Sequence, residues 1–342
     1  MEGDKHRVQL RVMVWVFVLV TLPSFAKSED GHSQDFFYYD YSDRDWEVVD
    51  YQNYSLPGVS VWKFRGPRPV LENKQYFSAI GAAQTLGVLI EKPYPSLLAE
   101  ELGLQALNLG LGGASPSAYS NDENIIETIN QGKFLILQVM RASSEANDRF
   151  TPTRQLGLVK NRQTGELESL SKAWARILQE EPENAALLVA QSQNSWVKSH
   201  LDLFAKIKVP VILFWFSPRK IDVEEPDYQI VLQRPSEFMS EYPSMVDLMT
   251  LERVRKLCDF PGICSAYVEV RSERERDFVF TNRFTGEPTE IDYTKLGVGD
   301  MDFKKKRNTA TSYWSQEMHE DAVAPLLKAV RELNDESLHS LR

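Results

Sequence analysis

The stretch Tyr76-Phe-Ser-Ala-Ile-Gly-Ala-Ala-Gln-Thr-Leu-Gly87 organises the rest of the chain. It predicts a buried strand at residues 76–80, then a turn of small residues, then a helix that opens near Pro93 and Pro95. In α/β proteins, ligands bind at the carboxyl ends of strands, where backbone N–H groups and helix N-termini converge. The turn therefore has the shape that presents a nucleophile, yet it holds alanine where a nucleophile is expected.

Four further strands follow, and helical sequence separates them. They are expected at residues 105–108, 134–140, 209–216 and 266–270. Two of these, FLILQVM and VPVILFWF, are the apolar runs typical of strands buried on both faces. The helices are expected at residues 122–129, 167–179, 184–207, 246–257 and 315–333. This alternation implies parallel crossovers, so we expect an α/β three-layer sandwich with a central, mainly parallel five-stranded sheet.

The N-terminus has the features of a targeting segment. A basic start precedes the apolar run at residues 12–22, and small residues follow at Ser24 and Ala26. We expect a signal peptide at 1–26, with an uncleaved anchor as the alternative. The run is too short to span a bilayer, and we expect no membrane span in the mature chain.

Two regions are expected after the signal peptide. Residues 27–55 form an acidic, tyrosine-rich arm, and residues 56–337 form a single α/β domain with a charged insert at about 271–308. The apolar side chains of the arm favour packing on the domain over exposure to water. They are Trp46, Val48, Val49 and Tyr51. Alternatively, the arm is an acidic recognition surface or a site of tyrosine sulfation.

Charge and cysteine content indicate the setting. The net charge of −10 argues against nucleic acid or anionic membrane as the main partner. Cys258 and Cys264 bracket a Pro-Gly turn and predict a local disulfide, with two separate buried thiols as the alternative. Asn53 begins the sequon for N-glycosylation. We therefore expect a secreted, extracellular protein. We expect no metal site, because no histidine lies near the cysteines.

Residues 81–87 (GAAQTLG) resemble the first block of the SGNH (GDSL-type) hydrolases, Gly-Asp-Ser-x-Thr/Ser-x-Gly. In this register Ala83 stands where those enzymes carry the nucleophilic serine. Residues 108–113 (NLGLGG) resemble the second block, with Gly113 in the place of the oxyanion-hole glycine. The third block, Gly-x-Asn-Asp, is absent. The last block, Asp-x-x-His, keeps only its histidine, His319.

A narrower resemblance covers more of the chain. The segments IGAAQTLG, LNLGLGGASP, VMRASSEAND and YWSQEMHEDA are similar to a mostly bacterial domain family of unknown function, over residues 39–330 or so. Both resemblances imply an SGNH/flavodoxin-like fold. Neither implies an activity here, because an alanine cannot attack an ester. We therefore expect no ester hydrolysis.

The same register predicts a ligand-binding cleft. Its expected side chains and loops are Gly81, Gln84, Asn108, Gly113 and Arg141, with His319 as the remnant of the catalytic site. Arg141, Arg149 and Arg219 follow strand ends, which favours an anionic or glycan ligand; the alternative is pairing with the abundant acids. We expect no cofactor, because neither a dinucleotide fingerprint nor a P-loop motif is present.

Two other functions stay open. The first is an esterase or acyltransferase that acts on acylated glycans through non-standard residues, such as Ser143 or Ser144 approaching His319. The second is an acidic component of the extracellular matrix, in which the arm matters more than the cleft. The ligand, the oligomeric state and the substrate do not follow from the sequence.

Overall fold

The computed structural model describes residues 41–59, 61–218, 243–260, 263–293, 306–311 and 313–339, with side chains described as far as residue 333. The expected signal peptide, residues 27–40 of the arm, Arg219 and residues 294–305 of the insert lie outside these ranges.

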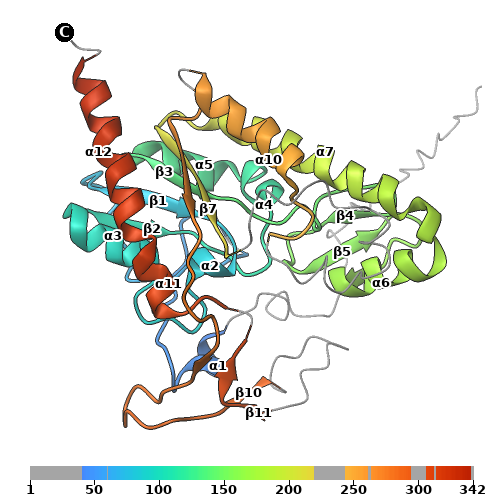
Figure 1. The fold of residues 1–342 in the computed structure, drawn as a ribbon, viewed down its shortest axis with the longest axis horizontal. Helices are drawn as coiled ribbons and strands as arrows, with labels where there is room; N and C mark the ends of the chain where they lie inside the picture. The colour runs from blue at the N-terminus through green and yellow to red at the C-terminus, as the bar shows by residue number, and fades with distance from the viewer. Residues whose placement is uncertain are drawn as a thin grey trace, which may run out of the picture. The chain divides into compact units, whose positions relative to one another are not determined.

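The described chain is built on a five-stranded parallel sheet (Figure 1). Its strands are β1 (Tyr76–Ile80), β2 (Gln105–Asn108), β3 (Leu135–Gln138), β7 (Val211–Phe216) and β8 (Ala266–Val270), in the order β2-β1-β3-β7-β8. All four pairings are parallel, which confirms the predicted sheet. β7 begins two residues later than expected, because Pro210 has no N–H to give to a ladder. The order corresponds to the flavodoxin-like arrangement of doubly wound sheets.

Helices cover both faces of the sheet, which confirms the three-layer sandwich. One face packs on α4 (Pro116–Ser120), α5 (Glu123–Gln131), α6 (Leu170–Glu180), α7 (Pro182–Lys206) and α10 (Leu248–Arg255). The other face packs on α3 (Tyr94–Leu102), α11 (Gln316–Asp321) and α12 (Val323–His339). Along β1 the side chains alternate between the two cores: Tyr76 and Ile80 belong to one, Phe77 and Ala79 to the other. Each central strand is therefore buried on both sides.

The helix boundaries follow local capping chemistry. α3 ends at Gly103, whose φ of +62° suits glycine and whose N–H bonds to the carbonyl of Ala99. α5 begins at Asp122, whose carboxylate accepts from the N–H groups of Asn124 and Ile125. The expected final helix is divided in two, with Ala322 between α11 and α12.

Several short elements were not expected from the sequence. A three-stranded antiparallel sheet contains β4 (Phe150–Pro152), β5 (Leu158–Asn161) and β6 (Leu167–Ser169). In the insert, β9 (Phe278–Val279) pairs with β12 (Thr309–Ala310), and β10 (Ile291–Asp292) with β11 (Lys306–Arg307). The remaining elements are α1 (Ser42–Asp45), α2 (Ala83–Leu86) and the 3-10 helix η2 (Lys256–Asp259).

The described part of the arm packs against the insert. Val49 and Tyr51 are buried, whereas Trp46 is about half exposed and lies against Arg283 and Phe284. The apolar side chains shared by the two segments and the loop after α2 form a cluster that we call the arm–insert cluster. Its buried members are Tyr41, Val49, Tyr51, Leu86, Val88, Leu89, Phe280, Ile291, Tyr293 and Ala310.

Two features expected of an exported protein have different outcomes. Cys258 and Cys264 form the predicted disulfide, next to η2. The sequon residue Asn53 is half-buried, and its Nδ2 donates to Ser42 Oγ at 2.6 Å, so its glycosylation stays a prediction. Among the helices that the structure describes, none is both long enough and apolar enough to cross a membrane.

Candidate functional site

The turn after β1 is fastened to β3 by its polar groups. Gln138 lies fully buried on β3, and its Oε1 accepts from the N–H of Ala82 at 3.1 Å and from Thr85 Oγ1 at 2.6 Å. A Cβ on Gly81 would lie 2.1 Å from Thr85 Oγ1 and 2.3 Å from Gln138 Oε1. The glycine that matches the SGNH register is therefore needed for this close packing.

The position of the missing nucleophile is filled by an apolar contact. Ala83 is the first residue of α2, a single turn that ends at Gly87 with φ of +72°. Its methyl group packs against the arm–insert cluster. Side chains of the arm and of the insert therefore pack against the position that matches the nucleophile in the SGNH register.

Asn108 joins two loops at this edge of the sheet. Its Nδ2 donates to the carbonyl of Thr85 at 2.8 Å, and its Oδ1 accepts from the N–H of Gly110 at 2.9 Å. Gly110 in turn packs against the α2 backbone, because a Cβ there would lie 2.1 Å from the nitrogen of Leu86. The side chain of Asn108 is therefore engaged in holding the turn and the glycine loop together.

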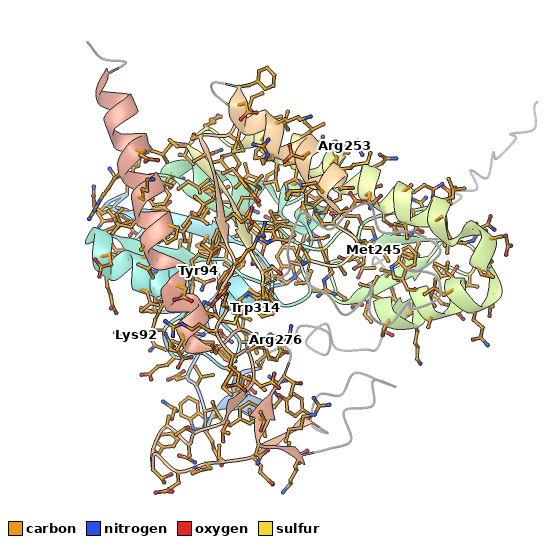
Figure 2. The ribbon with its side chains drawn as sticks, in the orientation of Figure 1. Lys92, Tyr94, Met245, Arg253, Arg276 and Trp314 are labelled. Carbon is orange, nitrogen blue, oxygen red and sulfur yellow. A yellow bond between two sulfur atoms is a disulfide. The ribbon has the colours of Figure 1, made fainter. Side chains whose placement is uncertain are left out.

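His319 is buried against Tyr94, the first residue of α3, and its chemistry differs from that of a catalytic base. The ring is buried beside Phe216, and its Nδ1 accepts from the N–H of Tyr94 at 3.1 Å. Tyr94 OH is 3.0 Å from Thr85 Oγ1, so one residue connects the histidine to the turn. Figure 2 labels Tyr94, the first residue of α3. Because Nδ1 accepts, the ring proton is on Nε2.

The electrostatics of His319 keep it neutral. Burial, and to a smaller extent the positive charge of Arg65, lowers the pKa of the imidazole to about 3. Its near neighbours on α11 do not orient the ring, because Gln316 bonds to the backbone of Lys92 and Glu317 is exposed. The main chain of Tyr94 takes that role.

Arg65 fixes the loop between α2 and α3, and no motif in the sequence pointed to it. Its guanidinium is buried, and it donates to four carbonyls: Nη1 to Leu86 and Gly87, Nη2 to Ile90 and Glu91. Burial lowers the pKa of this side chain to about 10, so it stays charged at neutral pH. The loop that presents Tyr94 to His319 therefore depends on a residue that precedes the sheet.

Gln84 and Arg141 keep hydrogen-bonding capacity at the carboxyl edge of the sheet. Gln84 follows β1 and Arg141 follows β3, and these strands are neighbours. Within the described chain, the buried Oε1 of Gln84 and the buried Nε of Arg141 have no hydrogen-bond partner. An unpaired buried polar atom costs about 1–3 kcal/mol, so a ligand that pairs with it is favoured.

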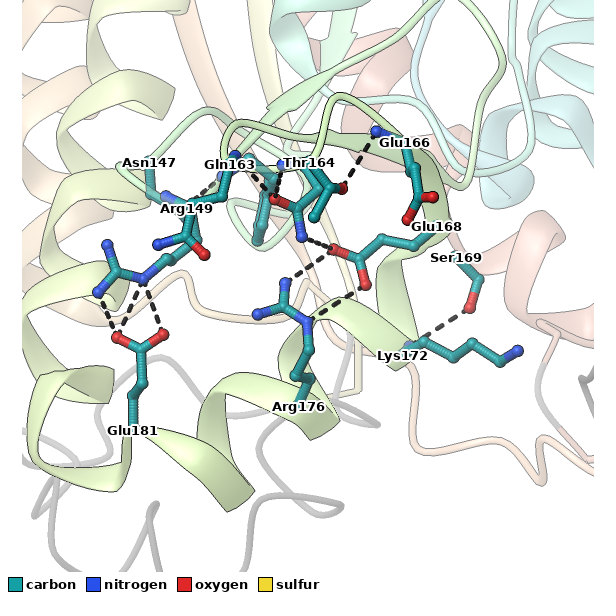
Figure 3. A network of polar contacts seen from close by, with 12 residues as sticks. Asn147, Arg149, Gln163, Thr164, Glu166, Glu168, Ser169, Lys172, Arg176 and Glu181 are labelled. Atoms are coloured by element: carbon teal, nitrogen blue, oxygen red, sulfur yellow. Dashed lines mark hydrogen bonds and ion pairs between the residues drawn. The ribbon is translucent and has the colours of Figure 1, made fainter.

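The other arginines at this rim differ from Arg141. Arg149 pairs with Glu181 in a two-pronged contact, with Nε 2.8 Å from Oε1 (Figure 3). This is the acid-pairing alternative, and it removes Arg149 from the expected anion site. Arg219 lies outside the described residues.

Ser143 and Ser144 follow β3 but have different surroundings. Ser143 Oγ shares a 2.6 Å hydrogen bond with Ser244 Oγ, and its carbonyl accepts from Trp174 Nε1. Ser144 instead lines a cavity of about 200 Å³ together with Gly113 and Trp62. The described contacts of both serines are on the α6 face of the sheet, whereas His319 packs with the core of the opposite face. The expected approach of either serine to His319 is not seen among these contacts.

Glu145 is a buried acid behind this cavity, and sequence reasoning missed it. Its Oε1 accepts from the N–H of Ser117 at 3.0 Å, and its Oε2 accepts from Ser199 Oγ at 3.2 Å. Burial raises the pKa of the carboxyl to about 7. Glu145 thus joins the start of α4 to the middle of α7. Among the described residues, no group of three His, Cys, Asp or Glu is placed to hold a metal ion.

Comparison with known proteins supports the family resemblance over part of the chain. A family model described as "Domain of unknown function (DUF6473)" matches residues 40–154. This range includes the segments at 81–87, 108–113 and 141–149 and stops before His319. No curated protein matches the chain.

Two solved structures are similar at low identity. One is LAE5, an alpha/beta hydrolase enzyme from the metagenome of Lake Arreo, Spain, at 11% identity, covering 75% of this chain and 94% of that chain with a TM-score of 0.35. The other is a catalytic mutant of Axe2, an acetylxylan esterase from Geobacillus stearothermophilus, at 12% identity, with the same coverage and a TM-score of 0.34. Likenesses this distant say nothing about activity, and the fold assignment rests on the sheet order.

Proposed function

We propose that this chain is a secreted, ligand-binding protein that keeps the frame of an SGNH-like hydrolase and does not hydrolyse esters. The binding site is the carboxyl edge of β1 and β3. One observation carries the proposal: Gln84 Oε1 and Arg141 Nε are buried there, and neither has a partner among the described residues.

The lack of hydrolysis is supported by the geometry of the turn. A serine hydrolase needs a hydroxyl and a base that can take its proton. Position 83 offers a methyl group. His319 directs the lone pair of Nδ1 at the N–H of Tyr94, and its low pKa makes it a poor proton acceptor. The chain therefore lacks both the nucleophile and an effective base at the positions of a catalytic triad.

The two unpaired atoms restrict the ligand. Gln84 Oε1 is an acceptor and needs a donor, whereas Arg141 Nε–H is a donor and needs an acceptor. A hydroxyl group satisfies both, and a carboxylate or sulfate satisfies the arginine best. A glycan that carries hydroxyl and acidic groups meets both requirements. The disulfide supports secretion, because such bonds persist in oxidising compartments.

The test uses the full mature protein, an array of neutral, carboxylated and sulfated oligosaccharides, and calorimetry on the glycans that bind. Arg141→Gln should weaken binding about tenfold or more, since a charge-assisted bond is worth about 1.5–3 kcal/mol. Arg162→Gln, on the loop after β5, is the matched control. Equal loss in both variants, or an array without a binder, contradicts the binding site.

Hydrolysis is assayed separately with p-nitrophenyl esters and acetylated sugars. We expect no turnover above the uncatalysed rate. Turnover that disappears in His319→Ala would contradict the proposal, because it would show that the histidine still serves as a base.

A further inference from the structure

Two further cavities have linings that include neither Gln84 nor Arg141. One cavity, of about 200 Å³, lies between the glycine loop, α4 and the β4–β5 hairpin. Another, of about 220 Å³, lies between the start of α5 and the residues Gly58, Val61 and Trp62. Trp62, Asn121, Asp122 and Arg154 line both, so the two cavities adjoin. We infer that they form a two-subsite pocket for a neutral disaccharide unit.

The shared wall is fixed by its own contacts. Trp62 is buried, and its Nε1 donates to the carbonyl of Arg154 at 3.1 Å, which joins this tryptophan to the β4–β5 hairpin. Asn121 Nδ2 donates to the carbonyl of Ser117 at 2.9 Å, so its amide is also held in place. A wall whose side chains are already ordered loses little conformational freedom when a ligand binds.

The lining of the first cavity suits a hydroxylated ligand. Four hydroxyl side chains line it: Ser115, Ser117, Ser144 and Thr153. Apolar surface comes from Trp62, Pro152 and Leu156. Sugar rings offer the matching combination of hydroxyl groups and C–H faces. Among the residues that the structure describes, Ser144 Oγ has no hydrogen-bond partner, so a ligand hydroxyl that reaches it breaks no existing bond.

The charges around the pocket favour a neutral ligand over an anionic one. Arg154 is exposed, and Asp122 on the same wall balances it, with its carboxylate capping α5. In the second cavity, Glu123 pairs with Lys206. The cationic and anionic side chains around the pocket therefore balance, so an anion gains no net attraction there and a neutral sugar loses nothing by comparison.

The size of the hollow is consistent with two rings. Each cavity is several times the ~30 Å³ that one water occupies in the liquid. Together they fall within the range of about 300–1,000 Å³ that is usual for small-molecule sites. A single monosaccharide would leave one of them filled only by solvent.

The test measures binding of cellobiose, xylobiose, maltose and chitobiose to the full mature protein, by calorimetry and by tryptophan fluorescence at millimolar sugar. A hyaluronan disaccharide serves as the anionic probe. We expect at least one neutral disaccharide to bind more tightly than its monosaccharide and than the anionic probe. Absence of binding by all neutral disaccharides, or tighter binding of the anionic probe, overturns the inference.

Two variants at one position separate hydrogen bonding from space. Ser144→Ala should weaken the disaccharide about fivefold, the effect of one hydrogen bond. Ser144→Leu should abolish binding, because it fills the first cavity. Ser143→Ala, at a neighbouring hydroxyl that does not line the pocket, should bind as the unaltered protein does. Equal weakening in Ser143→Ala and Ser144→Ala places the sugar elsewhere. Arg141→Gln should leave this affinity unchanged, so the result stands apart from the proposed function.

Discussion

The turn at residues 81–87 and the segment at residues 141–149 follow neighbouring strands and use their polar groups in opposite ways. In the turn, Thr85 and the N–H of Ala82 bond to Gln138, and only Gln84 keeps an unpaired buried side-chain oxygen among the described residues. In the segment, two buried polar atoms, Arg141 Nε and Ser144 Oγ, have no partner in the described chain. The turn matches a known sequence block and uses most of its polar groups internally, whereas the segment matches no catalytic block and keeps two unpaired buried polar atoms among the described residues.

The difference teaches that a familiar register can persist for packing alone. Gly81, Asn108 and Gly110 match the SGNH pattern, and each has a structural task that does not involve a substrate. Capacity to bind is better sought where a buried donor or acceptor is left over, since native structures rarely tolerate such atoms without compensation.

The largest expected effect on stability is in the turn at residues 81–87. Gly81→Ala places a Cβ about 2 Å from two oxygens on different elements, so the turn and β3 must separate. We expect the free energy of unfolding to fall by about 3 kcal/mol or more, measured by urea denaturation. Gly165→Ala is the control, because no described atom lies within 4 Å of its Cβ and only its φ of +78° opposes alanine; its cost should be about 1 kcal/mol. Similar costs for both would mean that the turn is not tightly packed.

The next effect belongs to the segment after β3. Because the pKa of Glu145 is raised from 4.5 to about 7, the folded state holds a proton that the unfolded state loses at lower pH. The contribution of Glu145 to the free energy of unfolding is thus complete below pH 4.5 and is lost as the pH rises to 7. Glu145→Gln should remove this loss and be more stable than the unaltered protein at about pH 8, by up to about 3 kcal/mol.

The control for Glu145 is Glu127→Gln, on the exposed side of α5. It should show the same pH dependence as the unaltered protein. The pKa values of His200 and His319 are lowered to about 4 and about 3, so the folded protein loses stability when acid protonates them. This loss is the same in every variant. A Glu145→Gln curve parallel to that of the unaltered protein from about pH 4 to about pH 8 would show that the pKa of the carboxyl is not shifted.

A smaller effect distinguishes the two regions directly. Ser144→Ala removes a hydroxyl that has no partner among the described residues, so the free energy of unfolding should stay within about 0.5 kcal/mol of its original value. Thr85→Val removes a hydroxyl that contacts both Gln138 and Tyr94, and should cost about 1–3 kcal/mol. If thermal unfolding gives the same loss of stability for both variants, the turn and the segment do not differ in how they use their polar groups.

The smallest expected effect is on catalysis. Ala83→Ser restores the hydroxyl at the nucleophile position but not the base, since Tyr94 N–H occupies His319 Nδ1. We expect no p-nitrophenyl acetate turnover above that of the unaltered protein. Adding His319→Ala to this variant tests the histidine. Turnover that needs both the introduced hydroxyl and His319 would show that the turn and the histidine can still support ester hydrolysis.

The central sheet was predictable because its strands are long apolar runs, as in residues 211–216. β4, β5 and β6 were not, because each is short and only partly buried. Within the site, the glycines and His319 follow a register that a sequence displays. Arg65 and Glu145 do not, because an isolated charged residue has the same appearance in sequence whether it lies buried or in water.

The arm–insert cluster also bears on how the chain is made. Tyr51 leaves the ribosome early, whereas Phe280 and Ile291, which it packs with, are translated more than two hundred residues later. Until then the apolar side chains of the arm lack their neighbours in the insert and are open to binding by chaperones. Leu86, Val88 and Leu89, in and beside the loop held by Arg65, belong to the same cluster, so a translation product that ends before the insert should leave these side chains without their apolar neighbours.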